Sequence, residues 1–152
     1  MTAITNDIEF RQALEALDAT RQRVVAAHFV EHVLDLSNDE RLAMVTRTAV
    51  NSAASDSELV AALSAARAAT FDGHTRCGSE GDWSEQASYF VARAAAAALT
   101  PAGQVPGGSA WQAAMSSRMA RTCKSISLDA ADNPAAGESA AQYRILSDFL
   151  DS

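Results

Sequence analysis

The sequence predicts an all-α fold, a compact bundle of about six to seven helices with no β-sheet. Alanine supplies 34 of the 152 residues, and alanine has the highest helix propensity of any residue but a low strand propensity. Apolar side chains recur at three- and four-residue spacing along most of the chain, and no segment alternates apolar and polar residues between turn signals. This length suits one domain, so we expect residues 1–152 to form a single helical domain.

Residues that favour helix N-caps divide the first half of the chain into four expected helices. The capping signals are Asn6 with Glu9, Asp18 or Thr20, Ser37 to Asp39, and Ser55 to Glu58. The apolar stripes behind them are Phe10–Leu14–Leu17, Val25–Phe29–Val33–Leu36, Leu42–Val45–Ala49 and Leu59–Leu63–Ala66. The fourth helix is expected to end near Phe71, because residues 72–82 contain three glycines and are typical of a loop.

Three further helices are expected in the second half. One starts at Asp82 or Ser84, and the Pro101–Gly108 segment, rich in proline and glycine, links it to a helix from Ser109. The apolar stripe of that sixth helix is Trp111, Met115, Met119, Thr122 and Ile126, which predicts a largely buried indole at Trp111. Residues 129–137 are expected to form a second linker before a seventh helix that ends the chain.

Charge and composition exclude several classes of protein. The formal net charge of -7 argues against nucleic-acid binding, which needs an electropositive surface. The start of the chain lacks the basic and apolar regions of a signal peptide, and no apolar run is long enough to span a membrane. Two cysteines form no disulfide framework, so we expect a cytoplasmic, reduced protein. Because no apolar run is long enough to span a membrane, we also expect no membrane partner. Homo-oligomerisation is left open.

One short motif has the spacing of a metal site. The segment His28-Phe29-Val30-Glu31-His32 matches H-x-x-E-H, in which histidines four residues apart share a helix face and bind zinc while the glutamate acts as base. A third ligand would come from His74 or Cys77. No sheet is predicted to support a peptidase cleft, so we favour two histidines flanking the core on the helix surface and keep zinc as the alternative.

The predicted loop 72–82 is the second candidate site. His74 and Cys77 lie three residues apart and could bind a metal or form a thiolate–imidazolium pair. No second Cys/His pair completes a zinc set, and a polar loop between helices explains the same composition. We therefore predict no cofactor here and keep a metal as the alternative.

A third candidate site is electrostatic. Residues 86–128 contain no acidic side chain, yet they include Arg93, Arg118, Arg121 and Lys124. Arg118 and Arg121 lie three residues apart and form a predicted basic ridge on the sixth helix. Together with Lys124 they are candidates for binding a partner's carboxylates or another anion. The alternative, which we favour, is internal pairing with acidic residues of neighbouring helices.

The alanine- and arginine-rich helices carry a family resemblance. The segments are residues 29–41, 61–70, 90–99 and 138–150, the last containing Gln142-Tyr143-Arg144. In these segments the chain resembles small all-helical bacterial immunity proteins of polymorphic-toxin systems. The resemblance implies a helical fold and a binding role, and it carries no catalytic residues over to this sequence.

The sequence contains no phosphate-binding glycine loop, nucleophile elbow, EF-hand or Glu-x-x-His pair. We therefore expect a non-enzymatic cytoplasmic protein that binds another protein, as an inhibitor, immunity protein or adaptor would, although an enzyme is not excluded. The alternative is a metal- or cofactor-binding helical domain that uses His28, His32, His74 and Cys77.

Overall fold

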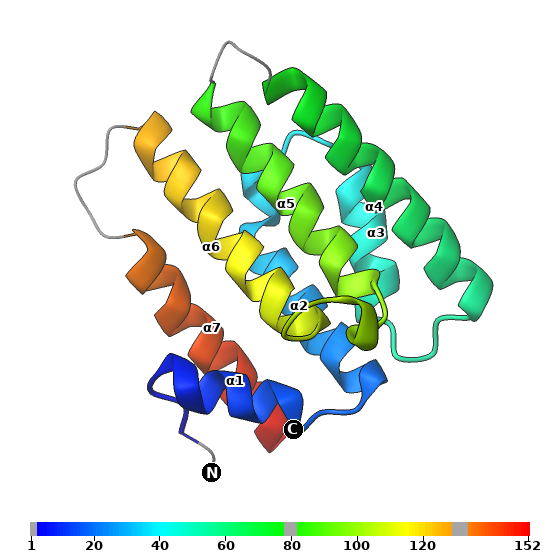
Figure 1. The fold of residues 1–152 in the computed structure, drawn as a ribbon, viewed down its shortest axis with the longest axis vertical. Coiled ribbons are helices and arrows are strands. Elements are labelled where there is room, and N and C mark those ends of the chain that lie inside the picture. The colour runs from blue at the N-terminus through cyan, green and yellow to red at the C-terminus, as the bar shows by residue number, and fades with distance from the viewer. Residues whose placement is uncertain (1–2, 78–81, 129–133) are drawn as a thin grey trace.

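The computed structural model describes residues 3–77, 82–128 and 134–152 (Figure 1). These residues form seven α-helices and two short 3₁₀ helices, with no strand among them, which confirms the predicted all-α bundle. The elements are α1 (Asp7–Glu15), α2 (Ala19–Val33), η1 (Leu34–Leu36), α3 (Arg41–Val50), α4 (Asp56–Cys77), α5 (Trp83–Leu99), η2 (Ala102–Gln104), α6 (Ser109–Ser127) and α7 (Pro134–Asp151). None of the described helices is both long and apolar enough to cross a membrane.

The helices form two layers (Figure 1). Helices α4, α5, α6 and α7 lie side by side in that order, and α2 and α3 lie behind them. The most extensive contact joins α5 to α6, and α2 packs against both of these helices from behind. Helix α4 is an edge helix that packs mainly on α5 and α3. Helix α1 lies at the end of the bundle that also holds the C-terminus.

Side-chain caps fix several helix starts as predicted. The side-chain oxygens of Asn6 and Asp18 each accept a hydrogen bond from the backbone N–H three residues later, at 2.9 Å. Ser55 and Glu58 form a reciprocal capping box: Glu58 N donates to Ser55 Oγ at 3.2 Å, and Ser55 N donates to Glu58 Oε1 at 3.0 Å. These bonds satisfy N–H groups that have no partner within the helix.

Helix α6 buries its small side chains instead of the predicted stripe of large ones. Met119 and Ile126 are both exposed, and Trp111 is only partly buried. The fully buried side chains of α6 include Ala110, Ala113, Ala114, Ser117 and Ala120. Helix α5 also turns alanines inward, and two alanine faces bring helix axes close together. Large side chains do not fit between such faces, so the prediction for Met119 and Ile126 was wrong.

The prediction of a loop at residues 72–82 was wrong for residues 72–77, which are helical. Helix α4 continues to Cys77, and residues 78–81 lie outside the described chain. Gly73 is a buried position within this helix, and a Cβ atom there would lie 3.2 Å from Tyr89 Cα on α5. The glycine therefore permits close approach of two helices and does not end one of them.

Of the two predicted linkers, the first has the predicted bounds and the second is shorter than predicted. The Pro101–Gly108 segment joins α5 to α6, contains η2, and holds Gly107 and Gly108 at φ of 80° and 94°. L-amino acids other than glycine rarely adopt such backbone angles. The second linker is shorter than predicted, because α7 begins at Pro134. Proline is favoured in the first turn of a helix, where its missing N–H removes no bond.

Candidate functional site

The predicted histidine pair lines a pocket between α2 and α7. Its volume is about 540 Å³, and Glu31, Asp148 and Phe149 also line it. The side chains of His28 and His32 are each 41% exposed. His28 Nδ1 lies 2.7 Å from Glu31 Oε1, and His32 Nδ1 lies at the same distance from a carboxylate oxygen of α7, Glu138 Oε2.

Glu138 connects three helices. Glu138 is only 2% exposed, and its Oε1 accepts a hydrogen bond from Arg121 Nε at 2.9 Å. Arg121 also donates to the backbone oxygen of His32 at 3.2 Å. The carboxylate thus binds one side chain from α2 and one from α6. Sequence reasoning missed Glu138, since a single glutamate next to a predicted linker gives no periodic or motif signal.

The Arg118 guanidinium also forms hydrogen bonds within the fold. Two of its guanidinium nitrogens donate to the two carboxylate oxygens of Asp7 at 2.9 and 3.0 Å, and its Nε donates to Gln142 Oε1 at 2.8 Å. The hydrogen bonds from Arg118 lower the pKa of the Asp7 carboxyl. Tyr143 donates its hydroxyl to the same carboxylate at 2.8 Å, and burial raises the Tyr143 pKa. Arg118 therefore ties α6 to both α1 and α7.

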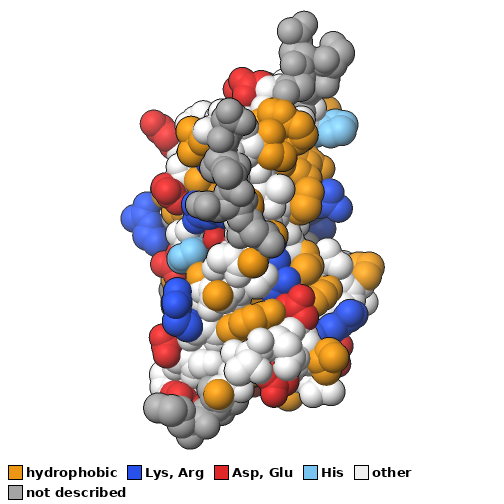
Figure 2. Space-filling model, turned by 90° about the vertical axis from the view of Figure 1, so that its left-hand side faces the viewer, with side chains coloured by type: hydrophobic (Ala, Val, Ile, Leu, Met, Phe, Trp, Pro, Cys, Tyr) orange, Lys and Arg blue, Asp and Glu red, His pale blue; other side chains and the backbone are white. Residues whose placement is uncertain are grey.

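Lys124, the third candidate on this helix, donates a hydrogen bond from Nζ to the neutral hydroxyl of Ser84 on α5 at 3.3 Å. Figure 2 views the α7 edge of the bundle, where acidic and basic side chains are interspersed across the surface not covered by grey atoms. The internal pairing that the sequence offered as the alternative is the arrangement found for Arg118 and Arg121. Binding of a partner or anion by this ridge stays a prediction.

His74 does not join the histidine pair. It lies on α4, with its ring centroid 5.9 Å from that of Tyr89 on α5, whereas His28 and His32 face α7. Cys77 is the last residue of α4, and its side chain is outside the described part of the structure. Within the described ranges, no three His, Cys, Asp or Glu side chains form a group able to hold a metal ion.

A second surface, which the sequence did not reveal, lies between α3 and α4. We name it the α3–α4 groove; its volume is about 500 Å³. The residues that line it are Glu40, Arg41, Met44, Val45, Thr48, Glu58, Ala61, Ala62 and Ala65. The sequence signal was ambiguous, because alanines flank the expected stripe Leu59–Leu63–Ala66 and do not show which apolar face of α4 is covered and which is open.

Comparison of the chain with protein families, with characterised proteins and with solved structures finds no match.

Proposed function

We propose that this protein acts by binding another protein, and that the α3–α4 groove receives a basic amphipathic helix of the partner. Such binding would suit an inhibitor, an immunity protein or an adaptor, with no catalysis required. The observation that carries the proposal is the groove itself, an apolar floor left uncovered at the edge of the bundle with two carboxylates beside it.

The walls of the groove carry the apolar side chains that a helix-binding surface needs. Alanines of α4 form one wall, and Met44 and Val45 of α3 form the other. Met44 is 68% exposed although it is a large apolar side chain. Methionine is flexible and polarizable, so it adapts to the shape of an incoming apolar group. Amphipathic helices bind grooves of this kind through apolar side chains at i, i+3, i+4 and i+7.

The charges beside the groove favour a basic partner. Glu40 and Glu58 both line it. The pKa of Glu58 is lowered, mainly by the hydrogen bond from the Ser55 backbone N–H and to a smaller extent by the one from the Ser55 hydroxyl, so this carboxylate stays ionised. A lysine or arginine beside the apolar face of a partner helix would lie close to these charges. The chain as a whole carries a net charge of -7, which speeds association with a basic partner.

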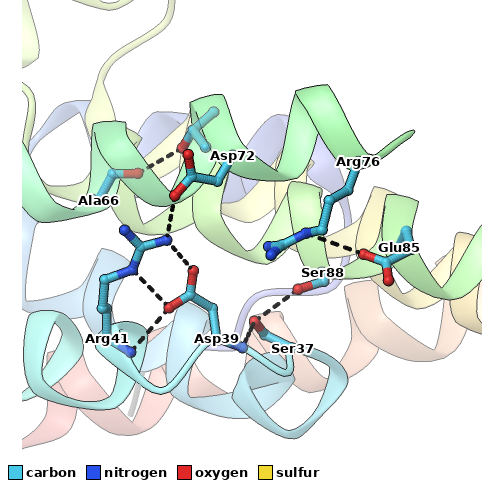
Figure 3. Close-up of polar contacts among 9 residues, drawn as sticks. Ser37, Asp39, Arg41, Ala66, Asp72, Arg76, Glu85 and Ser88 are labelled. Carbon is cyan, nitrogen blue, oxygen red and sulfur yellow. Dashed lines mark hydrogen bonds and ion pairs between the residues drawn. The ribbon is translucent and has the colours of Figure 1, made fainter. Parts of the chain in front are cut away.

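Arg41, the cation of the groove, is already neutralised. Its guanidinium donates to the carboxylate of Asp39 at 2.9 and 2.6 Å and to Asp72 Oδ2 at 2.9 Å (Figure 3). Hydrogen bonding from Arg41 lowers the pKa of Asp39, so this pair persists over the physiological range. Among the residues that line the groove, the two glutamates therefore carry negative charge that no unpaired lining cation offsets.

A synthetic peptide probe tests this proposal. The probe is an amphipathic helix with leucines on one face and lysines along both borders of that face, and its control carries glutamates in place of the lysines. Fluorescence anisotropy should show binding of the lysine peptide that weakens with added salt, and little binding of the glutamate peptide.

A pair of matched variants locates the binding. Ala61→Arg fills the groove, and Ala43→Arg places the same side chain at an exposed position of α3 that does not line it. Ala61→Arg should weaken peptide binding about tenfold or more, equivalent to ~1.4 kcal/mol, and Ala43→Arg should leave it unchanged. Equal affinities for the two variants would contradict the groove as the binding surface.

A further inference from the structure

We infer that His28 and His32 form a two-histidine site for a divalent transition-metal ion such as Zn²⁺, in the pocket between α2 and α7. This site is independent of the α3–α4 groove. The inference rests on spacing and hydrogen bonding together: the two histidines lie on successive turns of one helix, and each ring is held by a carboxylate through the same nitrogen.

The carboxylates set which nitrogen faces an incoming ion. An ionised carboxylate only accepts hydrogen bonds, so the Nδ1 atoms of His28 and His32 must carry the proton that they donate to Glu31 and Glu138. In the neutral ring the lone pair then lies on Nε2, the atom left to bind a metal. Histidine ligands of metals commonly hold a carboxylate through the second nitrogen in this way, which orients the ring and raises its basicity.

The support for His32 is a buried carboxylate with a second partner. Glu138 is buried, and Arg121 holds its other oxygen at 2.9 Å, so the carboxylate is fixed before any ion binds. The support for His28 is the more exposed Glu31, three residues along the same helix. With both carboxylates ionised, the two neutral rings therefore start from the same tautomer.

The donor set predicts the character of the site. Imidazole nitrogens bind Zn²⁺ and Cu²⁺ well and bind Mg²⁺ or Ca²⁺ poorly. Asp148 lines the same pocket, but no three of the described His, Cys, Asp and Glu side chains form a group able to hold a metal ion, so Asp148 is not counted as a ligand. Because the protein supplies two nitrogen ligands, water completes the coordination, and the ion exchanges readily instead of being held as a closed structural site.

Zinc titration of the full chain, made without a histidine tag, tests the inference. A chelating dye that competes for Zn²⁺ should report one equivalent bound. His28→Ala and His32→Ala should each weaken binding about tenfold or more, since each removes one of two ligands. His74→Ala is the matched control, because it removes the remaining histidine of the chain and should leave the affinity unchanged.

Two further measurements keep the test decisive if a variant fails to fold. In the unaltered chain, the imidazole proton signals of His28 and His32 should shift or broaden on Zn²⁺ addition, and that of His74 should not. Glu31→Gln should weaken binding less than loss of either histidine, while retaining one equivalent. Absence of saturable binding, equal loss with His74→Ala, or shifts of His74 alone would overturn the inference.

Discussion

Alanine builds both the α5–α6 contact and the α3–α4 hairpin, yet the first is sealed and the second is open. Ala94 and Ala113 are fully buried in α5 and α6, with α2 packed behind both helices. Ala61 and Ala65 lie on the wall of the α3–α4 groove, at the edge of the bundle. Small side chains allow close helix packing, but a further layer decides whether they are covered.

The same contrast holds for charge. On α6, Arg118 and Arg121 are paired with carboxylates from α1 and α7. At the groove, Glu40 forms no ion pair with any side chain in the described parts of the chain, and Glu58 accepts from the N–H group of its own helix start. Arg118 and Arg121 are satisfied inside the fold, whereas Glu40 is exposed beside an apolar surface and is available to a partner.

The largest expected effect is on the sealed side. Arg121→Glu places a second carboxylate against Glu138, which is almost fully enclosed, and loss of a buried charge's partner costs about 3–5 kcal/mol. Arg93→Glu is the matched control at an exposed position of α5 and should change stability by less than about 0.5 kcal/mol. Urea unfolding followed by circular dichroism measures both. Similar midpoints for the two variants would mean that Glu138 does not anchor the bundle.

A pair of identical substitutions compares the two alanine surfaces directly. Ala113→Leu adds three carbons to a fully buried position and should cost about 1–3 kcal/mol through overpacking. Ala61→Leu adds the same group to the open groove and should change stability by no more than about 0.5 kcal/mol. If both variants lost equal stability in thermal melts, the groove would be a packed interface and not a free one.

A smaller effect depends on pH. Arg118 holds the folded-state pKa of Asp7 below its ordinary value of 3.8, so the ionised form favours the folded state. This contribution is present above that ordinary value and is lost as pH falls through the folded-state pKa. Asp7→Asn should therefore lower stability at neutral pH by about 0.2–1 kcal/mol, as expected for a partly exposed pair. The difference between the two proteins should shrink in urea melts as pH falls below about 4, and a constant difference would contradict the ionic origin.

The helix starts could be predicted because their causes are local. Asn6, Asp18 and Ser55 each satisfy backbone donors within the next three residues, so the sequence contains the whole interaction. The all-α class was equally accessible, because it follows from composition and spacing over the full chain.

The inner face of α6 could not be predicted, because its cause is tertiary. A scale of hydrophobicity favours Met119 and Ile126 over alanine, but the narrow space beside α5 admits only the alanine face. Gly73 misled the prediction for the same reason: close contact with Tyr89 on another helix requires a glycine that, in sequence, resembles a break.

The site residues divide in the same way. The spacing of His28 and His32 predicted that the two would share a helix face, and both do line one pocket. Their carboxylate partners differ: Glu31 lies within the same turn, whereas Glu138 is 106 residues away from His32 along the chain. Long-range pairs of this kind require the fold, and so did the α3–α4 groove.

Methionine methyl signals test the central claim, that the α3–α4 groove is open to a basic helix while α6 is not. Met44 lies in the groove, and Met119 is an exposed methionine of α6. With ¹³C-methyl methionine, titration with the lysine-bordered peptide should shift the Met44 signal saturably and leave that of Met119 in place. A shift confined to Met119, or equal shifts of both signals, would contradict the account.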